Sequence, residues 1–112
     1  MPNIKINKLR CTTPDEIDKD EIYLKLGGKK IWPQGEMYYR LDTGEEVGID
    51  LTLDVKEDWQ EIELWDYDYL SRNDLLGSFK FKVDNVSGKY STSMQLLEED
   101  STASYILEWE II

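Results

Sequence analysis

The sequence contains no histidine and a single cysteine, Cys11, and both shortages limit its chemistry. Without histidine the chain cannot form a serine–histidine catalytic triad or a histidine-ligated zinc site. One cysteine cannot close an intramolecular disulfide or build a zinc ribbon, and it favours a reducing compartment. No apolar run approaches the ~18 residues of a membrane span, and the N-terminus shows no signal peptide. We therefore expect a cytoplasmic protein, or one peripheral to a membrane.

Positive charge is also scarce. The chain has 13 lysines and arginines and 24 aspartates and glutamates, which gives a formal net charge of −11 at pH 7. Such an acidic chain repels the phosphate backbone, so a nucleic acid partner is not expected. With 112 residues, 40% hydrophobic and 12% aromatic, the chain can bury a core. We expect residues 1–112 to form a single domain and not a disordered segment.

The apolar residues repeat mainly with a period of two, which is typical of strands that bury one face. The clearest alternation runs from Val47 to Val55, and no segment of useful length shows the helical period. Eight candidate strands follow, separated by turn-forming residues: 4–9, 22–26, 37–41, 47–55, 62–64, 79–83, 90–97 and 105–111. This pattern predicts an all-β fold, an eight-stranded antiparallel β-sandwich.

The negative charge is concentrated in four connections. If consecutive strands alternate in direction, the segments 10–21, 42–46, 66–77 and 98–101 all lie at one end of the sandwich. These segments hold fourteen acidic and three basic residues, a difference of −11, whereas the rest of the chain holds ten of each. The sequence therefore predicts a neutral sandwich with an acidic rim.

Three carboxylates of this rim are expected to point inwards. Asp20 has the parity of the apolar residues that follow it, and Asp66 and Asp68 continue the parity of those before them. Burying several like charges together costs several kcal/mol unless a cation or proton compensates. A flexible cup of oxygen ligands suits calcium better than magnesium, so we expect a Ca²⁺ site. The alternative is a solvated acidic loop whose side chains stabilise turns.

An EF-hand is excluded as the source of this acidic pattern. Its loop requires glycine at the sixth position and glutamate at the twelfth. Counted from Asp66, those positions are Ser71 and Gly77.

The segment 65–77 instead resembles the third calcium-binding loop of a C2 domain, the module of synaptotagmins, protein kinase C and phospholipases. That loop has the pattern Asp-x-Asp, five residues, Asp and a later glycine, which Asp66, Asp68, Asp74 and Gly77 match. The segment 20–26 similarly occupies the place of the family's Asp-Pro-Tyr-Val-Lys-Val strand start. The resemblance extends over essentially the whole chain in strand order, and it implies the permuted, phospholipase-type topology.

The resemblance also implies a set of metal ligands. Pro14 stands where the family has a further first-loop aspartate, so Asp15 or Asp18 would replace it. The implied Ca²⁺ ligands are Asp20, Asp66, Asp68 and Asp74, with Asp15 or Asp18 and the backbone carbonyl of Tyr67.

Apolar loop tips complete the predicted site. Leu70, beside Tyr69, stands where the family often presents a residue that enters a bilayer, and Ile17 occupies a similar place in the first loop. The resemblance thus implies a calcium-binding module that docks to phospholipid or to a protein partner. The alternative is a calcium-independent protein-interaction module of a larger assembly. An enzyme is not expected, because the chain lacks histidine, an activated nucleophile and a glycine-rich phosphate loop.

Overall fold

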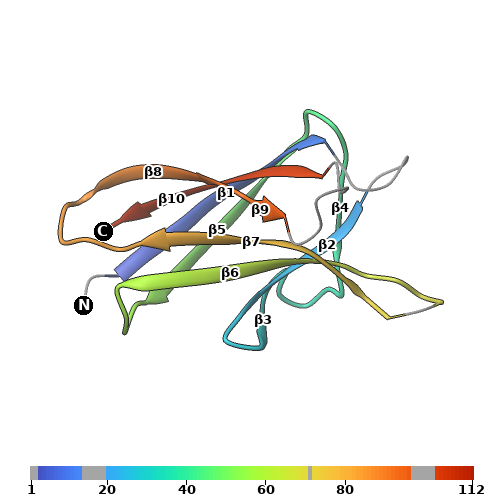
Figure 1. Cartoon of the computed structure of the whole chain (residues 1–112), viewed down its shortest axis with the longest axis horizontal. Coiled ribbons are helices and arrows are strands. Elements are labelled where there is room, and N and C mark those ends of the chain that lie inside the picture. The colour runs from blue at the N-terminus through green and yellow to red at the C-terminus, as the bar shows by residue number, and fades with distance from the viewer. Residues whose placement is uncertain (1–2, 14–19, 71, 97–102) are drawn as a thin grey trace.

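The structure is a computed structural model that describes residues 3–13, 20–70, 72–96 and 103–112 (Figure 1). All regular elements of these residues are β-strands, which confirms the all-β prediction. The strands are β1 (Asn3–Thr13), β2 (Asp20–Leu26), β3 (Lys29–Trp32), β4 (Tyr39–Leu41), β5 (Glu46–Asp54), β6 (Trp59–Asp66), β7 (Asp74–Lys82), β8 (Gly88–Ser93), β9 (Gln95–Leu96) and β10 (Ser104–Ile111).

The strands form two sheets that pack as a sandwich. The first sheet has the order β5-β1-β10-β8, and the second has the order β3-β2-β6-β7-β9. β4 also pairs with β2, along the half that β3 leaves open, so β3 and β4 together make one interrupted edge. Every pairing is antiparallel, as the alternation predicts.

The strand count differs from the eight expected. The short β3 follows the tight turn at Gly27 and Gly28, where two lysines hide the alternation. The expected strand 90–97 divides into β8, in the first sheet, and β9, in the second. Gly77 makes this crossing possible, because a Cβ atom there would lie 2.3 Å from the carbonyl oxygen of Gln95. Glycine therefore lets β9 approach β7 closely.

The core lies between the sheets and consists of the inward-facing residues of the predicted alternation. Ile22 and Leu24 of β2 belong, with Leu107 of β10, to one cluster of buried apolar side chains. At one edge of the core, the ring of Trp109 stacks on Phe81 at 4.2 Å and on Tyr90 at 4.7 Å between centroids. The described part of the chain contains no helix with the length and apolar character needed to cross a membrane.

The strand register brings the strand ends that border the acidic connections to one end of the sandwich. Thr13 pairs with Ser104, Asp20 with Leu41 and Arg10 with Glu46, so these strands begin or end together. The loop between β6 and β7 projects from this same end, opposite the two chain termini (Figure 1). The expected common loop end is therefore confirmed for the strands that border it.

Candidate binding site at the loop end

Two of the expected metal ligands are buried at the loop end. Asp20 opens β2 and is 0% exposed, and its Oδ2 accepts a hydrogen bond from the hydroxyl of Tyr105 on β10. Asp66 closes β6 and is 3% exposed, and its Oδ1 accepts a hydrogen bond of 3.0 Å from the backbone N–H of Glu21. The inward orientation predicted for both carboxylates is confirmed. Asp66 thereby ties β6 to β2 within one sheet, and Asp20 ties β2 to β10 of the other sheet, so both also have a structural role.

The contact between Asp20 and Tyr105 links the two sheets. Burial raises the pKa of the Tyr105 phenol above its ordinary value, and the hydrogen bond to Asp20 raises it further. The phenol therefore stays protonated and continues to donate to the carboxylate. Nothing in the local pattern marks Tyr105 as a partner, because 85 residues separate the two positions.

The third loop is held in shape by its own polar groups. Asp68 accepts a hydrogen bond of 2.8 Å from the N–H of Leu70, and its own N–H donates to Asn73 at 2.9 Å. The Asn73 amide in turn donates to the hydroxyl of Tyr23 at 2.8 Å, which fastens the loop to β2. Asn73 was not among the predicted site residues, although asparagine beside a turn is a common signal of such bonding.

The remaining predicted ligands lie in different surroundings. Asp74 opens β7, is exposed and pairs in register with Asp66. Tyr67 is half-buried, and its N–H donates to the carbonyl of Glu21 at 2.7 Å. Across the described ranges, no three acidic or cysteine side chains come close enough to hold a metal ion. Three further candidates lie outside the described residues: Asp15, Ile17 and Asp18.

Aromatic rings form a surface patch next to the third loop. The ring of Tyr67 lies 5.3 Å from that of Tyr38 and 4.9 Å from that of Tyr69, and the hydroxyls of Tyr38 and Tyr69 are 2.7 Å apart. That hydrogen bond raises the pKa of Tyr69. Leu70, at the tip, is 97% exposed, and Tyr69 is 65% exposed. We call Tyr38, Tyr67, Tyr69 and Leu70 the tyrosine patch.

Tyr38 is the member of this patch that the sequence did not predict. It belongs to the segment between β3 and β4, and the alternation around it suggested a strand. The available signal was the adjacent pair Tyr38 and Tyr39, which follows the turn formers Pro33 and Gly35.

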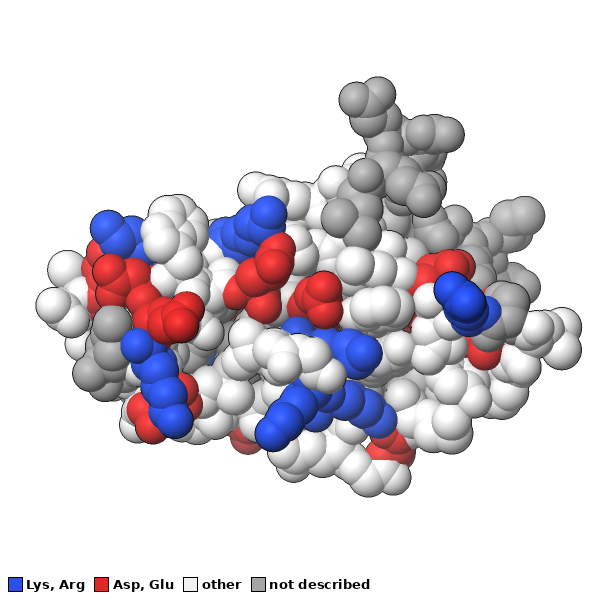
Figure 2. Space-filling view, turned by 60° about the horizontal axis from the view of Figure 1, so that its bottom comes forward, with Lys and Arg blue, Asp and Glu red and all other residues white. Residues whose placement is uncertain are grey.

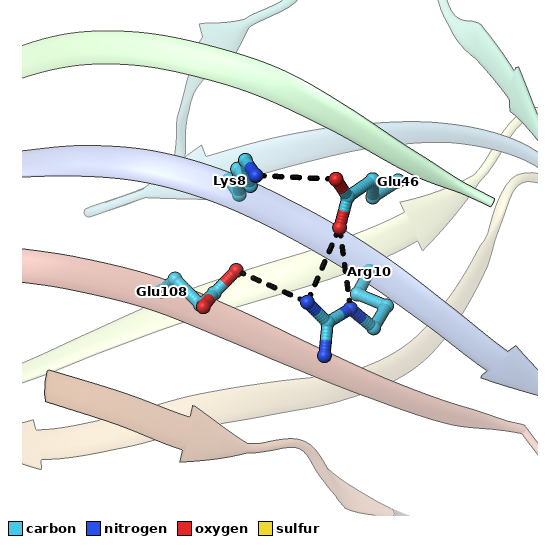
Figure 3. Close-up of polar contacts among 4 residues, drawn as sticks. All are labelled: Lys8, Arg10, Glu46 and Glu108. Carbon is cyan, nitrogen blue, oxygen red and sulfur yellow. Dashed lines mark hydrogen bonds and ion pairs between the residues drawn. The ribbon is translucent and has the colours of Figure 1, made fainter. Parts of the chain in front are cut away.

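Charged side chains pair with one another on the surface of the first sheet. On the outer face of the first sheet, Glu46 accepts hydrogen bonds from Lys8 at 3.1 Å and from Arg10 at 3.2 Å (Figure 3). These bonds lower the pKa of Glu46. Arg10 also lies 3.7 Å from Glu108. On another face, Figure 2 shows basic side chains among acidic ones rather than a surface of one sign.

The fold is similar to those of known C2 domains, although neither a family model nor a curated protein matches the chain. One similar structure is a C2 domain of plant extended synaptotagmin 1, with 11% identity over 97% of this chain and 94% of that one, and a TM-score of 0.53. Another is described simply as a C2 domain, with 10% identity over 99% and 98% of the two chains and a TM-score of 0.56.

A third similar structure is the human GIVD cytosolic phospholipase A2. It shares 10% identity over 97% of this chain but only 16% of its own length, with a TM-score of 0.54. At such identities the likeness shows a shared fold. Because the synaptotagmin and the phospholipase match almost equally well, the permuted topology stays a prediction. The assignment of residues 1–112 to a single domain also stays a prediction.

Proposed function

We propose that this chain, a β-sandwich with the C2-type fold, is a docking module that binds phospholipid surfaces through its tyrosine patch. The observation that carries this proposal is Leu70, which is 97% exposed at the tip of a hydrogen-bonded loop. Tyrosine rings below an apolar tip suit the boundary between lipid and water. Burying the leucine side chain contributes about 1.5–3 kcal/mol, too little for permanent anchoring. The chain would therefore associate with the membrane peripherally and reversibly.

Electrostatics decide which lipids the tyrosine patch would meet. With a net charge of −11, the chain is repelled by anionic headgroups unless a cation intervenes. We therefore expect binding to zwitterionic vesicles without calcium, and weaker binding to anionic vesicles.

A second proposal is that Ca²⁺ binds at the loop end and reverses this preference. Its support is the fit of Asp66, Asp68 and Asp74 to the C2 loop spacing, together with the burial of Asp20 at the same end. Carboxylate oxygens and the carbonyl of Tyr67 would be suitable ligands for this hard cation. Asp15 or Asp18 would complete the set.

Co-sedimentation with vesicles tests the lipid proposal. Phosphatidylcholine vesicles, with and without phosphatidylserine, are pelleted in the presence of calcium or of a chelator. Leu70→Ser should reduce pelleting with phosphatidylcholine several-fold, whereas the control Val86→Ser should not. Val86 is 66% exposed but lies in the turn between β7 and β8, at the opposite end. Equal pelleting of both variants, or none by the wild type under any condition, contradicts lipid docking and favours the protein-interaction alternative.

Calorimetric titration with calcium tests the second proposal separately. The wild type should bind with measurable heat, and Asp66→Asn/Asp68→Asn should not. Negligible heat for both proteins would exclude the calcium site and leave the lipid proposal standing.

We also propose that the chain binds rather than catalyses. Its one thiol, Cys11, is buried, and burial raises the pKa of that thiol to about 11. At neutral pH the thiol is therefore protonated and a poor nucleophile.

A further inference from the structure

One edge of the sandwich combines an unpaired strand with an open groove. β5 ends the first sheet and pairs with β1, and no other described strand pairs with its outer edge. Such an edge presents backbone N–H and C=O groups that can pair with another extended chain.

The groove runs along the inner side of β5. A cavity of about 540 Å³ lies between Leu51 and Leu53 of β5 and the edge of the second sheet, where Ile31 and Pro33 line it. A second cavity of about 300 Å³ shares Leu51 and Pro33 with the first and continues to Val47. The two cavities form one groove between the edges of the two sheets.

A bulge restricts where another strand can pair. The register between β1 and β5 shifts between Gly48 and Leu51, and Asp50 within this shift has a φ of 54°. A positive φ at a residue other than glycine interrupts a regular edge, which discourages indiscriminate pairing. The bulge divides the edge into a shorter regular stretch, 46–48, and a longer one, 51–54, which lies beside the larger cavity.

The side chains of this stretch alternate in chemistry. Leu51 and Leu53 are half-buried and line the groove, whereas Thr52 and Asp54 are exposed on the outer face. In a strand added to this edge, every second side chain would enter the groove and the others would lie beside Thr52 and the exposed carboxylate of Asp54. Asp50, in the bulge, already pairs with Lys5 at 2.9 Å. Apolar residues suit the first positions and basic residues suit the second.

We propose that the edge 51–54 and its groove bind an extended peptide segment of a partner protein in which apolar and basic residues alternate. Backbone pairing supplies affinity in this mode, and the pockets for alternate side chains supply specificity. No residue of the tyrosine patch lines either cavity, so this proposal does not rest on lipid or calcium binding.

The test uses three synthetic nine-residue peptides. In the first, valine alternates with lysine, and in the second, valine alternates with glutamate. The third has the same amino acids as the first, but its valines follow one another in a single block. Each is titrated into the isotope-labelled protein, and backbone amide shifts are followed by NMR. The alternating lysine peptide should shift the amide signals of residues 51–54, 30–32, 34 and 35, and it should bind at least about tenfold more tightly than the other two peptides. Equal binding of the blocked peptide, or shifts confined to other surfaces, overturns the proposal.

A matched pair of variants tests the groove itself. Leu53→Ser should weaken binding of the alternating lysine peptide about tenfold, because it removes an apolar wall of the groove. Leu96→Ser makes the same change on β9, an edge strand on the other side of the second sheet, and should leave binding unchanged. Melting curves confirm that both variants fold. Equal affinities for the two variants, or a wild-type dimer in sedimentation that Leu53→Ser abolishes, would refute a peptide site.

Discussion

Replacing Tyr105 by phenylalanine should destabilise the fold, because the Tyr105 hydroxyl donates a hydrogen bond to the fully buried carboxylate of Asp20. Phenylalanine fills the same space, so the change removes one donor and creates no large cavity. A hydrogen bond to a charged group contributes about 1.5–3 kcal/mol. We therefore expect the free energy of unfolding to fall by about this amount at pH 7.

The expected shift in melting temperature follows from the length of the chain. An unfolding entropy of about 2.1 cal/mol/K per residue over 112 residues corresponds to about 4 °C for each kcal/mol. The loss of 1.5–3 kcal/mol thus predicts a melting temperature about 6–12 °C lower.

Equilibrium unfolding in urea, followed by tryptophan fluorescence with a chelator present, measures the effect. The matched control is Tyr90→Phe, which removes an exposed hydroxyl that donates to the carbonyl of Val86 at 2.9 Å. Tyr90→Phe should lower the free energy of unfolding by at most about 0.5 kcal/mol. Indistinguishable unfolding midpoints for Tyr105→Phe and Tyr90→Phe would falsify the structural role of this hydroxyl.

The pH dependence gives an independent check. The pKa of Tyr105 is raised in the folded protein, so its stabilising contribution is complete below the unfolded value of about 10 and is lost as pH rises further. The difference in stability between the wild type and Tyr105→Phe should therefore shrink above about pH 10.

Three further predictions concern other residues. Gly77→Ala should lower the free energy of unfolding in urea by about 1–3 kcal/mol, because the added Cβ would meet the carbonyl oxygen of Gln95 on β9. The control is Gly48→Ala, whose added Cβ would have no atom within 4 Å. Equal losses of stability for the two variants would contradict the close approach of β9. Cys11 should resist iodoacetamide at pH 8 until urea unfolds the chain, because its pKa is about 11; rapid native alkylation contradicts its burial. The pKa of Glu46 is lowered in the folded protein by its bonds to Lys8 and Arg10. Its contribution to the free energy of unfolding is therefore complete above about pH 4.3, the value in the unfolded chain, and is lost as the pH falls further. Glu46→Gln should flatten the fall of the melting temperature between about pH 6 and 3, and an unchanged slope contradicts the pairing.

The position of the acidic rim could be predicted although two strands were missed. β3 and β4 run in the same direction because both pair antiparallel with β2. β8 and β9 follow one another along a single stretch that changes sheets at Met94. Neither extra strand reverses the chain, so the alternation of directions is preserved. The described strand ends that border the four connections therefore still lie at one end.

The contacts within the site could not be predicted in the same way. The hydroxyls of Tyr38 and Tyr69 meet across 31 residues, and Tyr105 reaches Asp20 across 85. Such pairs depend on sheet order and on register between strands that are distant in the sequence. The spacing of the third-loop aspartates indicated a loop but not the hydrogen bonds that Asn73 makes within it.

The sequence by itself determined which faces of the strands are buried and where the excess charge lies. Both follow from local geometry, because side chains alternate along a strand and each turn reverses the chain. Three features were decided by the tertiary structure alone. These are the hydrogen-bond donor of Asp20, the contacts between the rings of the tyrosine patch, and the position of β5 at an open edge. These depend on the order in which the strands assemble, and an alternating pattern is compatible with several such orders.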